Sequence, residues 1–148
     1  GIKISSNIKK QIQKELKYIL DKFSTYKNFS KRVINSKKKL LDILKKLKRK
    51  NSTIIGYGAT AKATTILNYC KINNDYINFF VDTTPEKINK FMPGKNIKII
   101  KYSKNILNNI DYIFLGAWNF KKEILIKERT YIKKGGKFIT HVPLPKIF

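Results

Sequence analysis

TIIGYGATAK, residues 53–62 of the chain, is the stretch that decides the fold, because it carries an apolar run through a glycine turn into a helix-forming segment. Gly56, Gly58 and Ala61 match the pattern G-x-G-x-x-A. In this pattern the first glycine turns the chain, the second lets backbone amides approach a diphosphate, and the small third residue lets helix and strand pack closely. Amides at the start of the helix favour an anion, and Lys62 adds a positive charge. The alternative is that the turn needs glycine for its geometry alone.

From Ser52 onward, apolar runs of strand length alternate with helical patterns, which is typical of parallel strands joined by crossovers. Because such crossovers are right-handed, we expect an α/β, Rossmann-like, doubly wound and mostly parallel five-stranded sheet. The first strand should be central, with ligands bound at the carboxyl ends of the strands. Pro143 and Pro145 should prevent further strand pairing. The predicted strands span 53–57, 76–82, 97–100, 111–117 and 137–141, and the predicted helices 59–71 and 120–133.

Residues 5–50 contain no glycine or proline and repeat apolar residues at helical spacing, which predicts two helices. Ser5 or Ser6 should cap the first, and Ser24–Asn28 should separate the two. A leucine stripe on the second helix, from Leu40 to Leu47, should pack on a neighbouring element. We therefore expect a helical lead-in over 1–51 and one Rossmann-like domain over 52–148.

The composition of the 148 residues limits the possible partners. Lysine and arginine total 33 against 9 acidic residues, a net charge of +24. The lysines are spread along the chain and arginine occurs only at 32, 49 and 129, so a nucleic-acid partner is not expected. One cysteine and one histidine exclude an internal disulfide and a zinc site. The sequence shows neither a long apolar run nor a signal peptide. We therefore expect no membrane partner and a cytoplasmic location.

Further candidate ligand-binding residues lie after the predicted strands. Asp82 ends the second strand, where a carboxylate can accept hydrogen bonds from a ribose; alternatively it caps the turn that follows. Trp118 and Asn119 follow the fourth strand and offer a flat face and an amide, although the ring can simply cover the sheet. His141 is more consistent with a strand end than with a general base, since no nucleophile or carboxylate is suitably spaced. No catalytic residue is therefore assigned.

Four ordered motifs together resemble one family, the C-terminal domain of SAM-dependent C-methyltransferases that methylate keto sugars carried on a nucleoside diphosphate. The resemblance covers about two thirds of the chain in register. The chain departs from the family pattern at Thr60, Thr64 and Thr83 among others, so the sugar or nucleotide bound can differ. The motifs are GYGATAKATTILNYC at 56–70, VDTTPEKINKFMPG at 81–94, AWN at 117–119 and GGKFI at 135–139.

The resemblance implies that this chain binds the nucleotide sugar. It also implies that a zinc domain and a SAM-binding domain precede it in the same polypeptide. SAM belongs to the full enzyme, so no cofactor is expected on this fragment, which should transfer no methyl group alone. Because Gly58 is expected to let the backbone approach the diphosphate, Gly58→Val should abolish sugar-nucleotide binding with the fold intact. The expected site comprises Gly56, Tyr57, Gly58, Ala59, Thr60, Ala61, Lys62, Thr64, Asp82, Pro85, Trp118 and Asn119.

The sequence leaves two other functions open. The glycine turn and Asp82 also suit an NAD(P)-binding domain of an oxidoreductase, with Asp82 on the adenosine ribose. The positive charge alone suits a non-enzymatic module that binds nucleic acid or an anionic membrane. Binding of nicotinamide nucleotides tests the first, and a steep loss of binding with salt tests the second.

Overall fold

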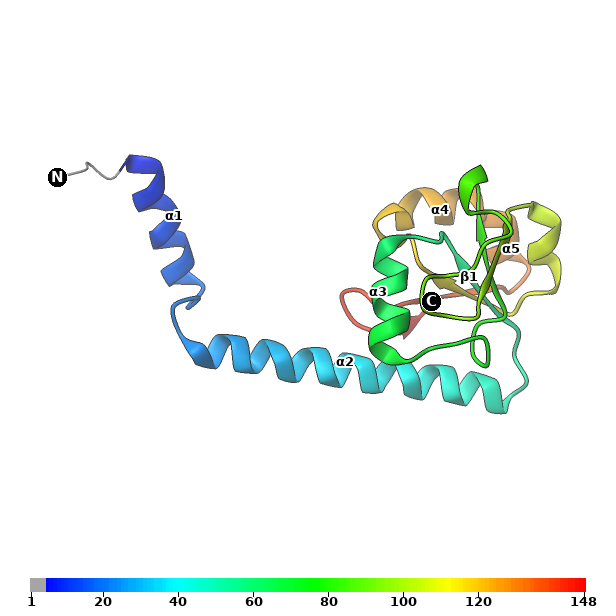
Figure 1. Ribbon diagram of the computed structural model, residues 1–148, viewed down its shortest axis with the longest axis horizontal. Coiled ribbons are helices and arrows are strands. Elements are labelled where there is room, and N and C mark those ends of the chain that lie inside the picture. Colours follow the sequence, from blue (N-terminus) through cyan, green and yellow to red (C-terminus); the bar gives the residue numbers. More distant parts are fainter. Residues whose placement is uncertain (1–4) are drawn as a thin grey trace. The chain divides into compact units, whose positions relative to one another are not determined.

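The computed structural model describes residues 5–148 (Figure 1). Its contacts divide the chain into two compact units, with the boundary between Ser36 and Lys37. The domain boundary expected after residue 51 stays a prediction. None of the helices within residues 5–148 is long and apolar enough to cross a membrane.

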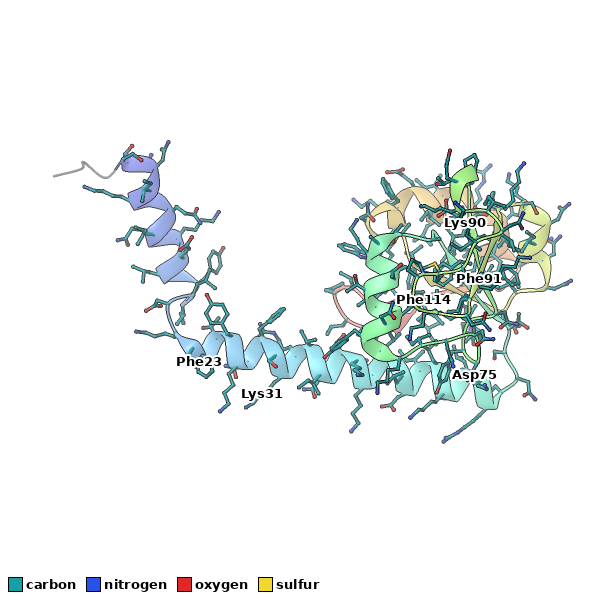
Figure 2. All side chains as sticks on the ribbon, viewed as in Figure 1. Phe23, Lys31, Asp75, Lys90, Phe91 and Phe114 are labelled. Atoms are coloured by element: carbon teal, nitrogen blue, oxygen red, sulfur yellow. The ribbon has the colours of Figure 1, made fainter. Side chains whose placement is uncertain are left out.

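The first unit is helical, as expected. Helix α1 spans Ser6–Lys17, and Ser5 caps it by accepting a hydrogen bond from the Ile8 amide at 3.4 Å. Helix α2 spans Phe23–Arg49. No residue of α1 is buried, and Phe23, labelled in Figure 2, is 80% exposed.

The predicted helix break at Ser24–Asn28 is wrong, because the chain turns at residues 18–22 instead. Ile19 adopts a left-handed φ of 56°, which ends the first helical path. The hydroxyls of Thr25 and Tyr26 then donate to the carbonyls of Ile19 and Leu20 at 2.6 and 2.7 Å. Residues 24–28, predicted to form the break, therefore lie in the first turns of α2.

The second unit contains a mostly parallel sheet, so the predicted fold class is confirmed. The strand order is β3-β2-β1-β4-β5-β6, with β1 inside the sheet between β2 and β4. The first five strands pair in parallel, which is the order of a doubly wound fold. The strands are β1 Ile54–Tyr57, β2 Phe79–Asp82, β3 Lys98–Lys101, β4 Tyr112–Leu115, β5 Lys137–Thr140 and β6 Lys146–Ile147.

A sixth strand corrects the expectation that the last two prolines end regular pairing. Strand β6 runs antiparallel to β5, with Ile139 opposite Ile147. Phe138 and Phe148 exchange backbone hydrogen bonds of 2.9 and 3.0 Å. Pro143 and Pro145 lie in the turn before β6, where a missing amide donor removes no hydrogen bond from the ladder.

Helices cover both faces of the sheet and divide the core in two. On one face, α3 (Ala61–Cys70) and the leucine stripe of α2 pack on alternate strand residues such as Phe80 and Phe114. Leu40, Leu44 and Leu47 are buried there, which confirms the predicted packing of the stripe. The other face is covered by the 3-10 helix η2 (Lys104–Asn109), α4 (Lys121–Lys127) and α5 (Arg129–Lys133).

The helix predicted over 120–133 is divided. The 3-10 helix η3 spans Trp118–Phe120 and α4 follows directly, but α4 ends at Lys127, and the next residue, Glu128, has φ −99° and ψ 23°. Helix α5 starts after this residue. Between β2 and β3 the only helical turn in the described chain is η1, Pro85–Lys87. The regions that interrupt regular structure therefore gather near the carboxyl ends of the central strands.

Candidate functional site

A cleft of about 330 Å³ opens at the carboxyl ends of β1, β2 and β4. This is the place where the strand order reverses, and ligands bind to doubly wound sheets at that place. Aromatic, hydroxyl and charged side chains share the lining, which suits a ligand with both flat and polar parts. The lining comprises Tyr57, Gly58, Thr60, Val81, Asp82, Thr83, Thr84, Lys87, Tyr102, Ala117, Phe120, Glu123, Ile124 and Lys127.

The backbone amides of the glycine turn are already engaged within the protein. Gly58 donates to the Val81 carbonyl at 2.9 Å, and Thr60 donates to the Gly58 carbonyl at 3.0 Å. The Ala59 amide donates to the Asp82 carboxylate at 2.7 Å. Three amides that a diphosphate would use in such a turn therefore have internal acceptors.

The start of helix α3 keeps two free donors. Thr60 caps the helix by accepting from the Ala63 amide at 3.2 Å, and its hydroxyl donates to the Gly116 carbonyl at 3.1 Å. The Ala61 and Lys62 amides have no acceptor within residues 5–148. Neither of these two residues lines the cleft.

Packing accounts for the glycines of the turn independently of any ligand. Gly58 has a φ of 83°, and a Cβ placed on it would lie 2.5 Å from the Cβ of Ala117. A Cβ on Gly56 would overlap the ring of Phe80 on the neighbouring strand. Loss of function in Gly58→Val would therefore mix a packing defect with any loss of binding.

Asp82 lies at the end of β2, as predicted, and holds the loops around it. Its carboxylate accepts from the amides of Ala59 at 2.7 Å and Thr84 at 2.8 Å, and Lys87 Nζ lies 3.4 Å away. Burial favours a higher pKa for Asp82, but the hydrogen bonds from Thr84 and Ala59 and the charge of Lys87 outweigh it and lower the pKa. The residue therefore stays ionised and joins the glycine turn to the loop after β2.

A buried carboxylate supports the wall of the cleft next to α4. Glu128, only 3% exposed, accepts hydrogen bonds on one oxygen from the hydroxyls of Tyr57 at 2.8 Å and Tyr102 at 2.7 Å. The two tyrosine rings meet edge to face with centroids 5.5 Å apart. Burial, followed by the hydrogen bond to Glu128, raises the pKa of both tyrosines well above its ordinary value. Both hydroxyls therefore stay protonated and keep the rings in place.

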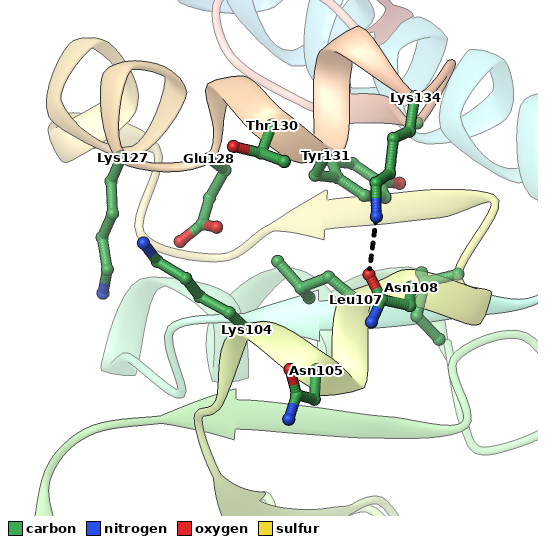
Figure 3. A pocket seen from close by; sticks show the side chains of 11 residues that line it. Lys104, Asn105, Leu107, Asn108, Lys127, Glu128, Thr130, Tyr131 and Lys134 are labelled. Atoms are coloured by element: carbon green, nitrogen blue, oxygen red, sulfur yellow. Dashed lines mark hydrogen bonds between the residues drawn. The ribbon is translucent and has the colours of Figure 1, made fainter.

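A second pocket of about 310 Å³ lies on the other side of this wall, between η2 and the α4–α5 junction. Figure 3 shows Glu128 extending into it and Lys134 donating to Asn108 Oδ1, a hydrogen bond of 3.2 Å. Lys127 is the one residue among the described linings that both pockets share. The wall between the pockets therefore carries one buried negative charge and one exposed positive charge.

The structure brings only part of the predicted site together. Tyr57, Gly58, Thr60 and Asp82 line the cleft. Trp118 is half-buried against the core of the α4 face, and Asn119 is exposed on η3. The ligand roles of all these residues stay predictions. The predicted residues outside the lining are Gly56, Ala59, Ala61, Lys62, Thr64, Pro85, Trp118 and Asn119.

Sequence reasoning missed the residues that complete the wall. Tyr102 directly follows β3, so the rule that pointed to Asp82 and Trp118 would also have found it. Lys127 and Glu128 belong to a helical stretch with no local signal for a site. Lys87, in η1, faces the cleft only because its loop turns back on Asp82.

His141 behaves as a buried residue at a strand end, in agreement with the prediction. Its ring stacks on Phe114 with centroids 5.4 Å apart, and its Nδ1 is buried with no hydrogen-bond partner within residues 5–148. Burial lowers the pKa of His141 to about 4. Across residues 5–148, no three His, Cys, Asp or Glu side chains gather to hold a metal ion.

Comparisons with known proteins match the chain to one family and to a longer relative. A family model described as "C-methyltransferase C-terminal domain" matches residues 2–143. The curated protein "C-methyltransferase NovU" of Streptomyces niveus is 31% identical over 122 residues. That match covers 82% of this chain and 29% of NovU, so the chain spans less than a third of the length of this relative.

Proposed function

Because this chain belongs to the family of C-methyltransferase C-terminal domains, we propose that it holds the acceptor of a SAM-dependent C-methyltransferase. The acceptor is a keto sugar on a nucleoside diphosphate, methylated at a carbon next to the ketone. It binds in the cleft at the carboxyl ends of β1, β2 and β4.

The composition of the cleft wall is the observation that supports this proposal. A nucleoside diphosphate sugar needs a flat apolar face for its base, positive charge for its phosphates and hydrogen-bonding groups for its hydroxyls. Tyr102 and Phe120 provide aromatic surface, and Lys87 and Lys127 provide positive charge. Thr83 and Thr84 provide hydroxyls in the same lining.

The role of the chain in the reaction is to bind and orient the acceptor. Methyl transfer to carbon requires that a proton leave the carbon beside the ketone, so that the resulting enolate attacks the methyl group. S-adenosylmethionine would supply that methyl group, with its methyl–sulfur bond breaking and S-adenosylhomocysteine as the leaving group. The lining contains no histidine or cysteine. Of its two carboxylates, Asp82 is held by two amides and Glu123 is an exposed side chain on α4. We therefore assign proton removal to another part of the longer enzyme.

The methyl donor does not fit this cleft well. Its ribose would need an acceptor carboxylate at the end of β2. Asp82 is 9% exposed and already accepts from Ala59 and Thr84. We therefore propose that SAM binds in a preceding domain of the same polypeptide, alongside a zinc domain, in keeping with the greater length of NovU. The same engagement of Asp82 and the turn amides argues against an NAD(P) site.

Isothermal titration of this chain tests the proposal. We expect saturable binding of thymidine diphosphate glucose at about 0.3 M salt, where the unspecific attraction of anions to a chain of net charge +24 is largely screened. Pyrophosphate should bind more weakly, and SAM and NADH should not bind. Preference for NADH, or equal weak binding of all four compounds, would contradict the proposal.

A further inference from the structure

We infer that Lys127 binds the diphosphate of the ligand in this cleft, in place of Lys62 and the amides of the glycine turn. This inference rests on the proposed function and names a binding residue within it. The sequence pattern places phosphate binding at the strand-to-helix turn of residues 56–62. The contacts of that turn point elsewhere.

The glycine turn presents no free donor to the cleft. The amides of Gly58, Ala59 and Thr60 all donate to protein acceptors at 3.0 Å or less. The remaining free amides, of Ala61 and Lys62, lie outside the lining, and the Lys62 side chain is exposed. A diphosphate in the cleft therefore needs another source of positive charge.

Lys127 supplies a positive charge that has no ion-pair partner in the described part of the chain. Its Nζ lies 3.9 Å from the centroid of the Tyr102 ring and 5.9 Å from that of Tyr57. No carboxylate oxygen within residues 5–148 lies within 4.0 Å of this nitrogen. The second lysine of the lining, Lys87, is in contrast paired with Asp82 at 3.4 Å. Of the two lysines, Lys127 is the one available to an anion.

The neighbours of Lys127 hold it in position without neutralising it. Glu128 fixes both tyrosine rings through their hydroxyls, so the aromatic faces under the ammonium group cannot turn away. Contact with an aromatic face orients an ammonium group while leaving its N–H donors available. Glu123 also lines the cleft, and Glu128 extends into the second pocket (Figure 3), but neither forms an ion pair with Lys127.

The test compares two lysine variants and two ligands. Lys127→Met keeps the length of the side chain and removes its charge, and Lys62→Met is the matched control on α3. Thymidine diphosphate glucose and thymidine are titrated into each variant and into the unchanged chain. We expect Lys127→Met to weaken the binding of thymidine diphosphate glucose about tenfold or more, because one charge-assisted hydrogen bond is lost. The affinity of Lys127→Met for thymidine should stay unchanged. Lys62→Met should bind both ligands with affinities within about twofold of those of the unchanged chain.

Other outcomes separate this inference from the proposed function. Unchanged binding of thymidine diphosphate glucose by Lys127→Met, or a large loss in Lys62→Met, overturns the assignment of Lys127 and leaves the nucleotide-sugar site standing. An equal loss of thymidine binding also overturns it, because the effect would not depend on phosphate. If the unchanged chain binds neither ligand, the proposed function fails and this inference fails with it.

Discussion

Asp82 shows how a residue can occupy the expected position and have another task. Its place at the end of β2 is where a ribose carboxylate is expected, yet it is buried and bonded to the Ala59 and Thr84 amides. A carboxylate that satisfies buried amides stabilises the loops that carry them. The observed role is therefore structural, and ribose binding by Asp82 stays a prediction.

Gly58 should be required for stability even without ligand. Gly58→Ala introduces a Cβ 2.5 Å from that of Ala117 and strains a φ of 83°. We expect its free energy of unfolding to fall by about 2–4 kcal/mol, from left-handed strain plus overpacking. Chemical denaturation of the ligand-free chain measures this change.

Gly135→Ala is the matched control for that experiment. Gly135 has a similar φ of 92°, but no atom lies within 4 Å of the position of an added Cβ. Only the backbone strain remains, so a loss of about 1–2 kcal/mol is expected. Equal losses in the two variants would show that the contact with Ala117 is not what requires glycine at Gly58.

His141 should make the stability of the chain depend on pH. The pKa of His141 is about 4 in the folded chain, against an ordinary value of 6.5 that applies to the unfolded chain. As the pH falls, the unfolded chain therefore binds the proton first. The stability that depends on a neutral His141 is fully present above pH 6.5 and is lost as the pH falls toward 4. It should change the free energy of unfolding by about 2 kcal/mol between pH 7 and 5.

His141→Leu provides the comparison, since the chain has one histidine. Denaturation at pH 5, 6 and 7 should show a smaller rise in stability with pH for the variant than for the unchanged chain. Parallel pH profiles for the two proteins would mean that His141 is not held neutral by burial.

At the scale of elements, the sequence predicted which helices and strands exist better than where they break. Hydrophobic periodicity depends on neighbouring residues, so α1, α2 and the first five strands were found. The break before α2 was misplaced because it depends on the backbone of Ile19 and on hydroxyls six residues away. The break at Glu128 was missed because partners 71 and 26 residues distant hold its carboxylate.

Helix α1 and the first part of α2 should contribute little to the stability of the sheet unit. No residue of α1 is buried, and the buried residues of α2 are Leu40, Leu44 and Leu47. A chain that begins at Lys37 should therefore keep its free energy of unfolding within about 1 kcal/mol, since surface residues rarely contribute more. Thermal or chemical denaturation of the shortened chain measures this.

Leu44→Ala is the control for that comparison, because Leu44 is fully buried in the core of the α3 face. It should lower the free energy of unfolding by about 2–5 kcal/mol in both the full and the shortened chain. If the shortened chain loses as much stability as this variant does, residues 5–36 contribute to the core of the folded protein.

At the scale of the whole molecule, the excess of positive charge causes unspecific binding of anions in addition to any specific binding. Residues 5–148 contain two ion pairs, Lys22 with Asp21 and Lys87 with Asp82. Most of the 33 basic side chains therefore have no acidic partner and attract anions in general. Salt weakens that general attraction. The contribution to binding of Lys127, which lies beside two fixed rings, therefore has to be measured at high salt.

The sequence by itself determined the class of fold and the edge of the sheet that carries the cleft. Alternating strands, helices and a glycine turn are local patterns, and the order of a doubly wound sheet follows from them. Only the tertiary structure decided which groups face the ligand. Asp82 reaches back 23 residues to the Ala59 amide, and Glu128 reaches 71 residues to Tyr57. Because such hydrogen bonds join distant segments, they engage the donors of the glycine turn and fix the rings beside Lys127, which local patterns cannot predict.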